Sequence, residues 1–189
     1  AELNHVNQEF PRVTGFMFYD DELNLEVRTT MALMNALERN NKERKKRDEI
    51  PYSFRGFVKS ELLVRHPEVA EAMYKAGFSV ILSGFESGSD RILTEHVRKT
   101  TTADINYKAA ELAFQNGMEI KALTMLGQPT ETLEDVRMTE KFIDSIGRLA
   151  QRYGKPWDFD MTILTPYPGS KVYDETVANE GKHREEFGK

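Results

Sequence analysis

The chain has 189 residues, of which 39% are hydrophobic and 30% are charged, so length and composition predict one globular domain with a strongly hydrated surface. Its net charge of -5 gives no general attraction to nucleic acid or anionic membranes, and no apolar run approaches the roughly 20 residues of a membrane-spanning helix. The absence of cysteine excludes disulfides, thiolate metal sites and cysteine nucleophiles within this chain.

Strand-like apolar runs alternate with helix-like segments at intervals of roughly 30 to 40 residues, as they do in βα units. Pro67 and Gly77 bracket one predicted helix, and apolar residues at helical spacing predict two more over residues 105–113 and 133–149. Asn116 and Gly117 supply a stop signal after the first of these two. The five predicted strands lie within residues 16–19, 52–58, 79–85, 119–127 and 158–166.

This alternation favours an α/β fold in which helices cover a parallel sheet, either a barrel or an open doubly wound sheet. We expect five parallel strands in sequence order, with the helices outside and residues 1–189 in a single domain. In either architecture the chemistry collects beyond the carboxyl ends of the strands. The edge strand at residues 16–19 is expected to be exposed and to invite pairing with a second copy of the chain.

Each predicted strand is followed by residues that can carry chemistry. The first three strands supply the acids Asp20, Asp21 and Glu22, then Arg55, and then Glu86 with Ser87. Many such residues only cap helices or form turns. Three adjacent carboxylates are harder to explain in this way, because they repel one another and need a cation, an ammonium group or open water to stay charged.

Five segments carry a family resemblance in their order and spacing. They are FMFYDDELN, GFSVILSGFESGSDRIL, VRKTTTADI, ALTMLGQPTET and ILTPYPGSKVYDE. Together they resemble the radical S-adenosylmethionine (radical SAM) superfamily, and within it the large group whose members often carry an N-terminal cobalamin-binding domain. The resemblance extends from about Gly15 to Glu180 and implies a partial (β/α) barrel of the TIM-barrel-like type.

The resemblance also implies a cofactor site. Asp20, Asp21 and Glu22 stand where the family holds the methionyl ammonium of S-adenosylmethionine, and Arg55 could pair with the cofactor carboxylate, with a substrate acid or with the acidic rim itself. Glu86, with Ser87 beside it, would accept hydrogen bonds from the ribose hydroxyls. The residues expected along the adenine and at the last strand are Leu126, Gly127, Thr165 and Tyr167.

The chain departs from the family in one respect, because members hold a 4Fe-4S cluster through a CxxxCxxC loop and this chain has no cysteine. We therefore expect a fragment containing five of the usual six strands, inactive without the cluster segment. The intact enzyme would cleave S-adenosylmethionine reductively to a 5'-deoxyadenosyl radical, for hydrogen abstraction or methyl transfer on a small-molecule substrate. An electron donor would serve the cluster, and cobalamin would take part in some members.

Two other functions stay open on the residues alone. One is a metal-dependent barrel lyase using Asp20, Asp21 and Glu86, and the other is a binding module without catalysis. His5, His66, His96 and His183 lack metal-ligand spacing. The mixed-charge run at residues 38–49 predicts a solvated loop or helix end, with nucleic-acid contact disfavoured because acids interrupt the bases. Since nothing resembles a signal peptide, we expect a cytoplasmic protein without membrane or nucleic-acid partners.

Overall fold

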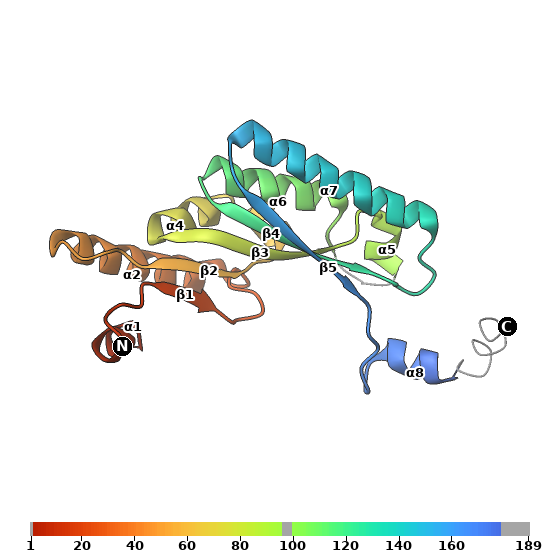
Figure 1. The fold of residues 1–189 in the computed structure, drawn as a ribbon, viewed down its shortest axis with the longest axis horizontal. Helices are drawn as coiled ribbons and strands as arrows, with labels where there is room; N and C mark the ends of the chain where they lie inside the picture. The colour runs from red at the N-terminus through yellow and green to blue at the C-terminus, as the bar shows by residue number, and fades with distance from the viewer. Residues whose placement is uncertain (1, 96–99, 179–189) are drawn as a thin grey trace.

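A computed structural model gives the structure of residues 2–95 and 100–178. Its sheet has five strands, all of them parallel, in the order of the sequence (Figure 1). The strands are β1 (Gly15–Phe18), β2 (Ser53–Phe57), β3 (Phe78–Glu86), β4 (Glu119–Leu126) and β5 (Trp157–Ile163). The predicted α/β fold with five parallel strands in sequence order is thereby confirmed.

Four longer helices cover one face of this sheet: α2 (Val27–Lys46), α4 (Glu68–Ala76), α6 (Ala103–Gln115) and α7 (Leu133–Tyr153) (Figure 1). Two short helices, α3 (Ser60–Arg65) and α5 (Asp90–Glu95), follow the ends of β2 and β3. Helix α1 (Glu2–Glu9) precedes β1, and α8 (Lys171–Ala178) stands away from the sheet beyond β5 (Figure 1). Three of the four covering helices were predicted by apolar spacing and stop signals.

The core lies between the sheet and the covering helices. Phe54, Ile81 and Ile120 point to this side from three adjacent strands and are almost fully buried, as are Met73 of α4 and Ile146 of α7. Because strand side chains alternate between faces, the residues between them point to the other side. We call that side the open face, since none of the helices within residues 2–95 and 100–178 covers it. Arg55 lies on it as the third of five residues in β2.

The charged run at residues 38–49 forms the end of α2 and the turn after it, as predicted. The expectation that this run is solvated is wrong for two of its side chains, Asn41 and Arg44, which are about 5% exposed. The Asn41 amide donates to the carbonyls of Tyr52 and Ala76, both at 2.9 Å, and accepts from the Tyr52 amide at 2.8 Å. This side chain therefore binds α2 to the start of β2 and the end of α4.

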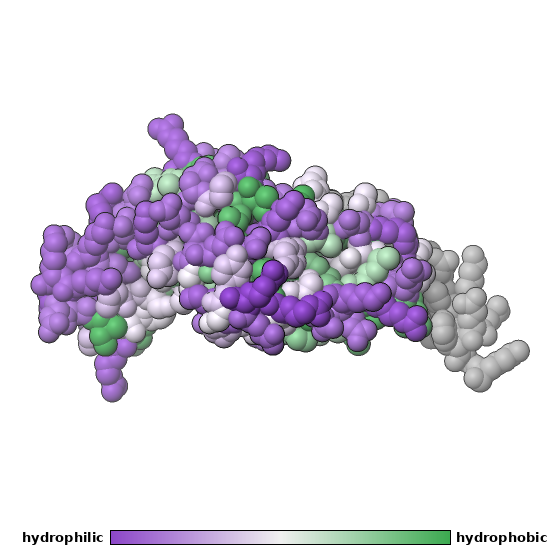
Figure 2. Space-filling view, turned by 90° about the horizontal axis from the view of Figure 1, so that it is seen from above, coloured by the Kyte–Doolittle hydropathy of each residue, from purple (hydrophilic) through white to green (hydrophobic). Residues whose placement is uncertain are grey.

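The outer surface over the helices is mainly hydrophilic. Figure 2 shows it from above, on the side where α7 lies uppermost in Figure 1, with only small hydrophobic patches. None of the helices in the described residues combines the length and apolarity needed to cross a membrane.

Candidate functional site

A pocket of about 210 Å³ lies at the carboxyl edge of the sheet, between the ends of β2 and β3 and the loop that follows β1. Three of the predicted residues, Asp21, Glu22 and Glu86, line it together with Lys59 and Glu61. Parallel strands bring their carboxyl ends to one edge, so acids that are 64 residues apart in the chain meet at one site. Four carboxyl groups around one ammonium group make this pocket predominantly acidic.

Glu22 and Lys59 form an ion pair across the pocket wall, with 2.8 Å between a Glu22 carboxylate oxygen and Lys59 Nζ. The hydrogen bond that Lys59 donates to Glu22 raises the pKa of Lys59, so this ammonium stays charged well above neutral pH. The two loops that carry the pair are joined by Asn24, whose buried amide donates to the Lys59 carbonyl and accepts from the Lys59 amide at 2.9 and 2.8 Å. Asn24 thus fixes the acidic loop against the end of β2.

Glu86 ends β3 in an unusual backbone conformation. Its φ is 57°, a left-handed value uncommon for a residue with a side chain, and the Ser87 amide donates across it to the Phe85 carbonyl at 2.7 Å. This i to i+2 hydrogen bond around a positive φ is a γ-turn of the rarer, strained form. Strain of this kind persists only where the surrounding structure enforces it, and it gathers at functional sites. The turn aims the last residue of β3 at the pocket.

The serines and glycine after Glu86 hold this turn against α7. Ser87 is fully buried, and its hydroxyl lies 3.1 Å from the Thr139 hydroxyl, which also accepts from the Gly88 amide at 3.0 Å. A Cβ at Gly88 would come within 2.6 Å of the Met138 carbonyl oxygen. Only glycine therefore permits this approach to α7, and Ser87 serves the strand end rather than the pocket.

A second set of hydrogen bonds secures the segment after the turn. Ser89 donates from its hydroxyl to Asp135 at 2.6 Å, and Arg91 binds the other oxygen of the same carboxylate. Thr132 donates to it as well, through both its amide and its hydroxyl, in the capping box of α7. The Arg91 guanidinium, followed by the Ser89 and Thr132 hydrogen bonds, holds the pKa of Asp135 well below its usual range. Asp135 is thus a buried anchor between α5 and α7.

The other predicted site residues occupy the same edge or the open face but do not line this pocket. Asp20 is exposed and lies on the far side of its loop, against α1 and α2. Arg55 lies on the open face one pleat before Phe57, which lines the pocket, and so about 6 to 7 Å toward the amino end of the strand. Four more residues lie at the ends of β4 and β5: Leu126, Gly127, Thr165 and Tyr167.

The end of β4 has its own arrangement around Gly127. This glycine has a φ of 82°, and its amide donates to Glu131 at 2.6 Å. The second carboxylate oxygen of Glu131 is buried and has no hydrogen-bond partner among the residues described. Across the edge, Thr165 and Tyr167 are exposed beyond β5. A ligand that extends from the acidic pocket along this edge would meet a buried acceptor beside Gly127.

Sequence reasoning missed four residues that build the site: Lys59, Asn24, Thr139 and Asn106. The last donates from its buried amide to the Phe85 carbonyl at 3.2 Å and so supports the turn at Glu86. Lys59 had a readable signal, because it directly follows a predicted strand whose end faces the acids. The other three act through pairings between distant segments that no local pattern reveals.

The open face carries an ion cluster between β4 and β5. Lys121 Nζ lies 3.0 Å from carboxylate oxygens of both Asp158 and Asp160. These two acids, Asp160 first, raise the pKa of Lys121, which in turn lowers the pKa of Asp158. Barrel interiors are usually filled by branched apolar side chains. Charges at these positions indicate that this part of the sheet faces water or a polar ligand.

The described residues contain no group of three or more histidine, aspartate or glutamate side chains arranged to hold a metal ion. The pattern predicted for a metal-dependent lyase, with Asp20, Asp21 and Glu86 on one ion, therefore finds no support in the geometry. His66 pairs with Glu68 on the surface, while His96 and His183 lie outside the described residues.

Comparisons with known proteins show what this chain is similar to. Residues 3–143 match the model of the radical SAM superfamily. The chain is 34% identical over 115 residues to an uncharacterized methyltransferase of Pyrococcus horikoshii, a match that covers 59% of this chain and 22% of the relative. It is also 34% identical over 76 residues to a Methanocaldococcus jannaschii protein named as a methylthiotransferase, covering 40% and 17% of the two chains. The chain thus matches about a fifth of the length of these relatives.

Solved structures share the fold. The cobalamin-dependent S-adenosylmethionine radical enzyme OxsB superposes with a TM-score of 0.71 at 16% identity, covering 97% of this chain and 30% of that chain. The radical S-adenosylmethionine methyltransferase TsrM from Kitasatospora setae, solved with cobalamin and a [4Fe-4S] cluster bound, gives 0.67 at 16% identity, covering 85% and 27%. At such low identity these likenesses bear on the fold alone.

Proposed function

From the premise that this chain belongs to the radical SAM superfamily, we propose that the acidic pocket at the carboxyl edge binds the methionyl and ribose parts of S-adenosylmethionine. The observation that carries the proposal is the meeting of Glu22, Lys59 and Glu86 in one pocket, with Glu86 held there by a strained turn. At about 210 Å³ the pocket is smaller than the roughly 300 to 1,000 Å³ typical of whole-ligand sites, so it takes one end of the cofactor.

The charges in the pocket match an amino-acid zwitterion. Asp21 and Glu22 offer carboxylates to the methionyl ammonium, and Lys59 offers an ammonium to the methionyl carboxylate. In the structure Glu22 and Lys59 neutralise each other at 2.8 Å, so a bound zwitterion would replace one ion pair with two. Lys59 suits this role better than Arg55, because Lys59 lines the pocket and Arg55 lies below it.

Glu86 is the group proposed for the ribose. A carboxylate accepts two hydrogen bonds at once, which suits the paired hydroxyls of a sugar. The turn fixes the backbone of Glu86 before any ligand arrives, so less ordering is required on binding. The adenine would then lie toward Gly127, where the unpartnered oxygen of Glu131 can accept a hydrogen bond from an amino group.

The residues of this chain do not fit a 4Fe-4S cluster, because the ligands of such clusters are cysteine thiolates and the sequence has none. The radical step therefore requires cluster ligands from outside these 189 residues, and we propose that the intact protein supplies them along with an electron donor. S-adenosylmethionine supplies radical or methyl-transfer chemistry when it is bound, and the residues of the pocket position it. Methyl transfer is favoured because the relatives are named as a methyltransferase and a methylthiotransferase. Use of cobalamin is favoured because the fold is shared with TsrM, which binds cobalamin, and with the cobalamin-dependent enzyme OxsB.

A binding module without catalysis is the second candidate function. The observation in its favour is that the acidic pocket forms in a chain that lacks cluster ligands. Both candidates predict cofactor binding, and they differ in whether a cluster-bearing intact protein releases 5'-deoxyadenosine under a reductant. Release would support the enzyme, and a protein that assembles its cluster without cleaving the cofactor would support the module.

The first test is a titration of the chain with S-adenosylmethionine, followed by ligand-observed NMR, which detects weak binding. Replacing Glu86→Ala should weaken binding about tenfold or more, since it removes hydrogen bonds to a charged acceptor, each about 1.5 to 3 kcal/mol. Glu140→Ala is the matched control, because Glu140 is an exposed carboxylate on α7 that does not line the pocket. Equal affinities for the two variants would contradict the assignment of the ribose to Glu86.

A further inference from the structure

The end of α2 is strongly basic. Residues 39–47 contain six lysine and arginine residues and one glutamate, within a chain whose net charge is -5. Because α2 runs antiparallel to the strands, this end lies at the amino edge of the sheet, away from the acidic pocket. Cations in the last turn of a helix interact favourably with the negative end of the helix dipole. This interaction explains the presence of Arg44, Lys45 and Lys46 in the last turn of α2. That effect falls off within one turn and does not account for Arg39.

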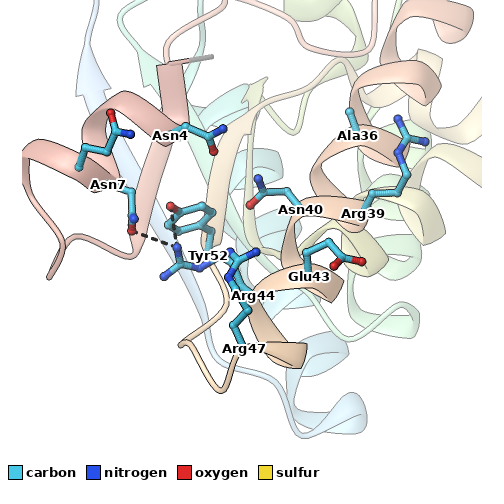
Figure 3. A pocket seen from close by; sticks show the side chains of 10 residues that line it. Asn4, Asn7, Ala36, Arg39, Asn40, Glu43, Arg44, Arg47 and Tyr52 are labelled. Atoms are coloured by element: carbon cyan, nitrogen blue, oxygen red, sulfur yellow. Dashed lines mark hydrogen bonds between the residues drawn. The ribbon is translucent and has the colours of Figure 1, made fainter.

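A pocket of about 510 Å³ lies beside this basic segment, between α1 and α2 (Figure 3). One wall is formed by Arg39, Asn40 and Arg44 of α2 and by Arg47, the residue that caps its end. Tyr52, which precedes β2, also lines the pocket. Glu43 is the one acidic residue in the lining, and it is paired with Lys46 at 2.7 Å. Glu49, just outside the lining, pairs with both Arg44 and Arg47. With Glu43 neutralised by Lys46, the three guanidinium groups still leave the pocket with a net positive charge after Glu49 is counted.

Several donors of these guanidinium groups are uncommitted. Arg44 pairs with Glu49 at 3.1 Å and is held in place by Asn7, by the Tyr52 hydroxyl and by the Ile50 carbonyl. Its Nη2 bonds to nothing within residues 2–95 and 100–178. Arg47 donates from Nε and Nη2 to Glu49, which leaves its Nη1 without a partner among the described residues. Arg39 is exposed and makes no hydrogen bond or ion pair in the same ranges, so its guanidinium can turn toward an anion.

Asn40 gives an independent sign of a missing partner. Its side-chain oxygen is buried without a hydrogen-bond partner in the described structure, and Figure 3 shows the amide directed toward Asn4 and Tyr52, between the two helices. A buried group of this kind costs free energy unless something pairs with it.

We propose that this pocket binds a small phosphate ester that carries hydroxyl groups. The phosphate would lie among Arg39, Arg44 and Arg47, since arginine matches phosphate oxygens with its planar fork of donors. A hydroxyl on the organic part would donate to the side-chain oxygen of Asn40. A phosphate monoester brings three terminal oxygens and close to two negative charges, which match three guanidinium groups better than the two oxygens and single charge of a carboxylate. The site is separate from the acidic pocket and does not depend on the function proposed for it.

The test uses the chain itself, isotopically labelled, titrated with ribose 5-phosphate, inorganic phosphate and ribose in separate NMR experiments. We expect saturable shifts in α1 and α2 with both phosphates, tighter binding of ribose 5-phosphate, and none with ribose. Arg39→Gln should weaken both phosphates about tenfold, the value of one charge-assisted hydrogen bond. Asn40→Ala should remove the advantage of ribose 5-phosphate over inorganic phosphate.

Two controls separate binding from folding. Arg148→Gln removes an exposed arginine on α7 that lies outside the pocket and should leave both affinities unchanged. Asn40→Ala should not lower the unfolding temperature, because it deletes an unpartnered buried oxygen. The proposal is overturned by the absence of saturable binding up to about 10 mM, by equal weakening in Arg148→Gln, or by a short oligoribonucleotide binding far more tightly than ribose 5-phosphate.

Discussion

At the residue scale, Asp135 is a buried carboxylate whose pKa is held well below its usual range by the groups that donate to it. Its side chain is 6% exposed and receives hydrogen bonds from Arg91, Ser89 and Thr132. These contacts join α5, α7 and the segment that follows the turn at Glu86. The charge of Asp135 therefore contributes to the stability of the fold. It also helps to position Glu86, the residue proposed to bind the ribose.

Asp135→Asn should lower the free energy of unfolding at neutral pH. The pKa of Asp135 is depressed in the folded state, so its stabilisation is complete above the ordinary aspartate value of about 3.9 and is lost as the pH falls below it. The gap between the native protein and the variant should thus be constant from about pH 5 to 7 and shrink below about pH 4. Urea unfolding across this pH range measures the difference in unfolding free energy between the native protein and the variant. Asp104→Asn is the control, because Asp104 forms an exposed ion pair with Lys108. A gap that widens in acid would contradict this account.

The candidate site was predictable from sequence where it depended on strand ends. Asp21, Glu22 and Glu86 follow clear apolar strands, and the parallel arrangement then brings them to one edge. From the sequence, Ser87 is as good a candidate for ligand binding as these acids. In the structure, however, its hydroxyl forms a hydrogen bond with that of Thr139, 52 residues away. Whether a hydroxyl serves a ligand or the fold depends on which helix packs over it, and local patterns do not contain that information.

At the element scale, the end of β3 and α7 approach each other more closely than a side chain would allow. The three atoms nearest to a Cβ at Gly88 belong to residues 138, 139 and 142 of α7 and would lie at 2.6 to 2.7 Å. Two of them are backbone atoms, which cannot move aside as a flexible side chain would. The contact therefore leaves no room for a side chain between α7 and the turn that follows β3.

Gly88→Ala should destabilise the fold by about 1 to 3 kcal/mol, the usual cost of overpacking, and should weaken cofactor binding by displacing Glu86. Chemical denaturation gives the first quantity, and the S-adenosylmethionine titration gives the second. Gly15→Ala is the control, because a Cβ there would meet no atom within 4 Å. Identical unfolding free energies for Gly88→Ala and Gly15→Ala would show that α7 can move away to make room for the added methyl group.

The elements themselves were largely readable from the sequence, since each strand is an apolar run with a clear turn after it. Helix α7 was predicted from its apolar spacing, and Ile146 and Leu149 are fully buried as that spacing requires. Helix α2 was not delimited because its second half reads as a charged run, although Asn41 and Arg44 are buried within it. Buried polar side chains that pair with backbone groups are invisible to hydrophobic periodicity.

At the scale of the whole molecule, the two edges of the sheet differ. The edge strand β5 carries Asp158 and Asp160, and charges on an edge discourage pairing with another chain. The opposite edge strand, β1, has the sequence GFMF without a charge, and Tyr19 beyond it is 82% exposed. If copies of this chain associate through their sheets, β1 is the edge that we expect them to use.

Met17→Lys should suppress that association, because lysine on an edge strand is a common natural defence against strand pairing. Met17 lies on the open face of β1, beside Arg55 in the register, so the substitution spares the core under the helices. Sedimentation velocity over a range of concentrations would show self-association in the native chain and less in the variant. Met138→Lys, at an exposed site on α7, should behave like the native chain. A native chain that stays monomeric at all concentrations would contradict this expectation.

The order of the strands also determines how much chain must be closed into a loop when each pair forms. Phe54 and Phe78, paired across β2 and β3, are 24 residues apart, and Val80 and Glu119, paired across β3 and β4, are 39 apart. Loop-closure entropy grows only with the logarithm of such lengths, and pairings of low contact order form quickly. Every strand meets only its neighbours in sequence, so the sheet can assemble one βα unit at a time, and no step must wait for the two ends of the chain to meet.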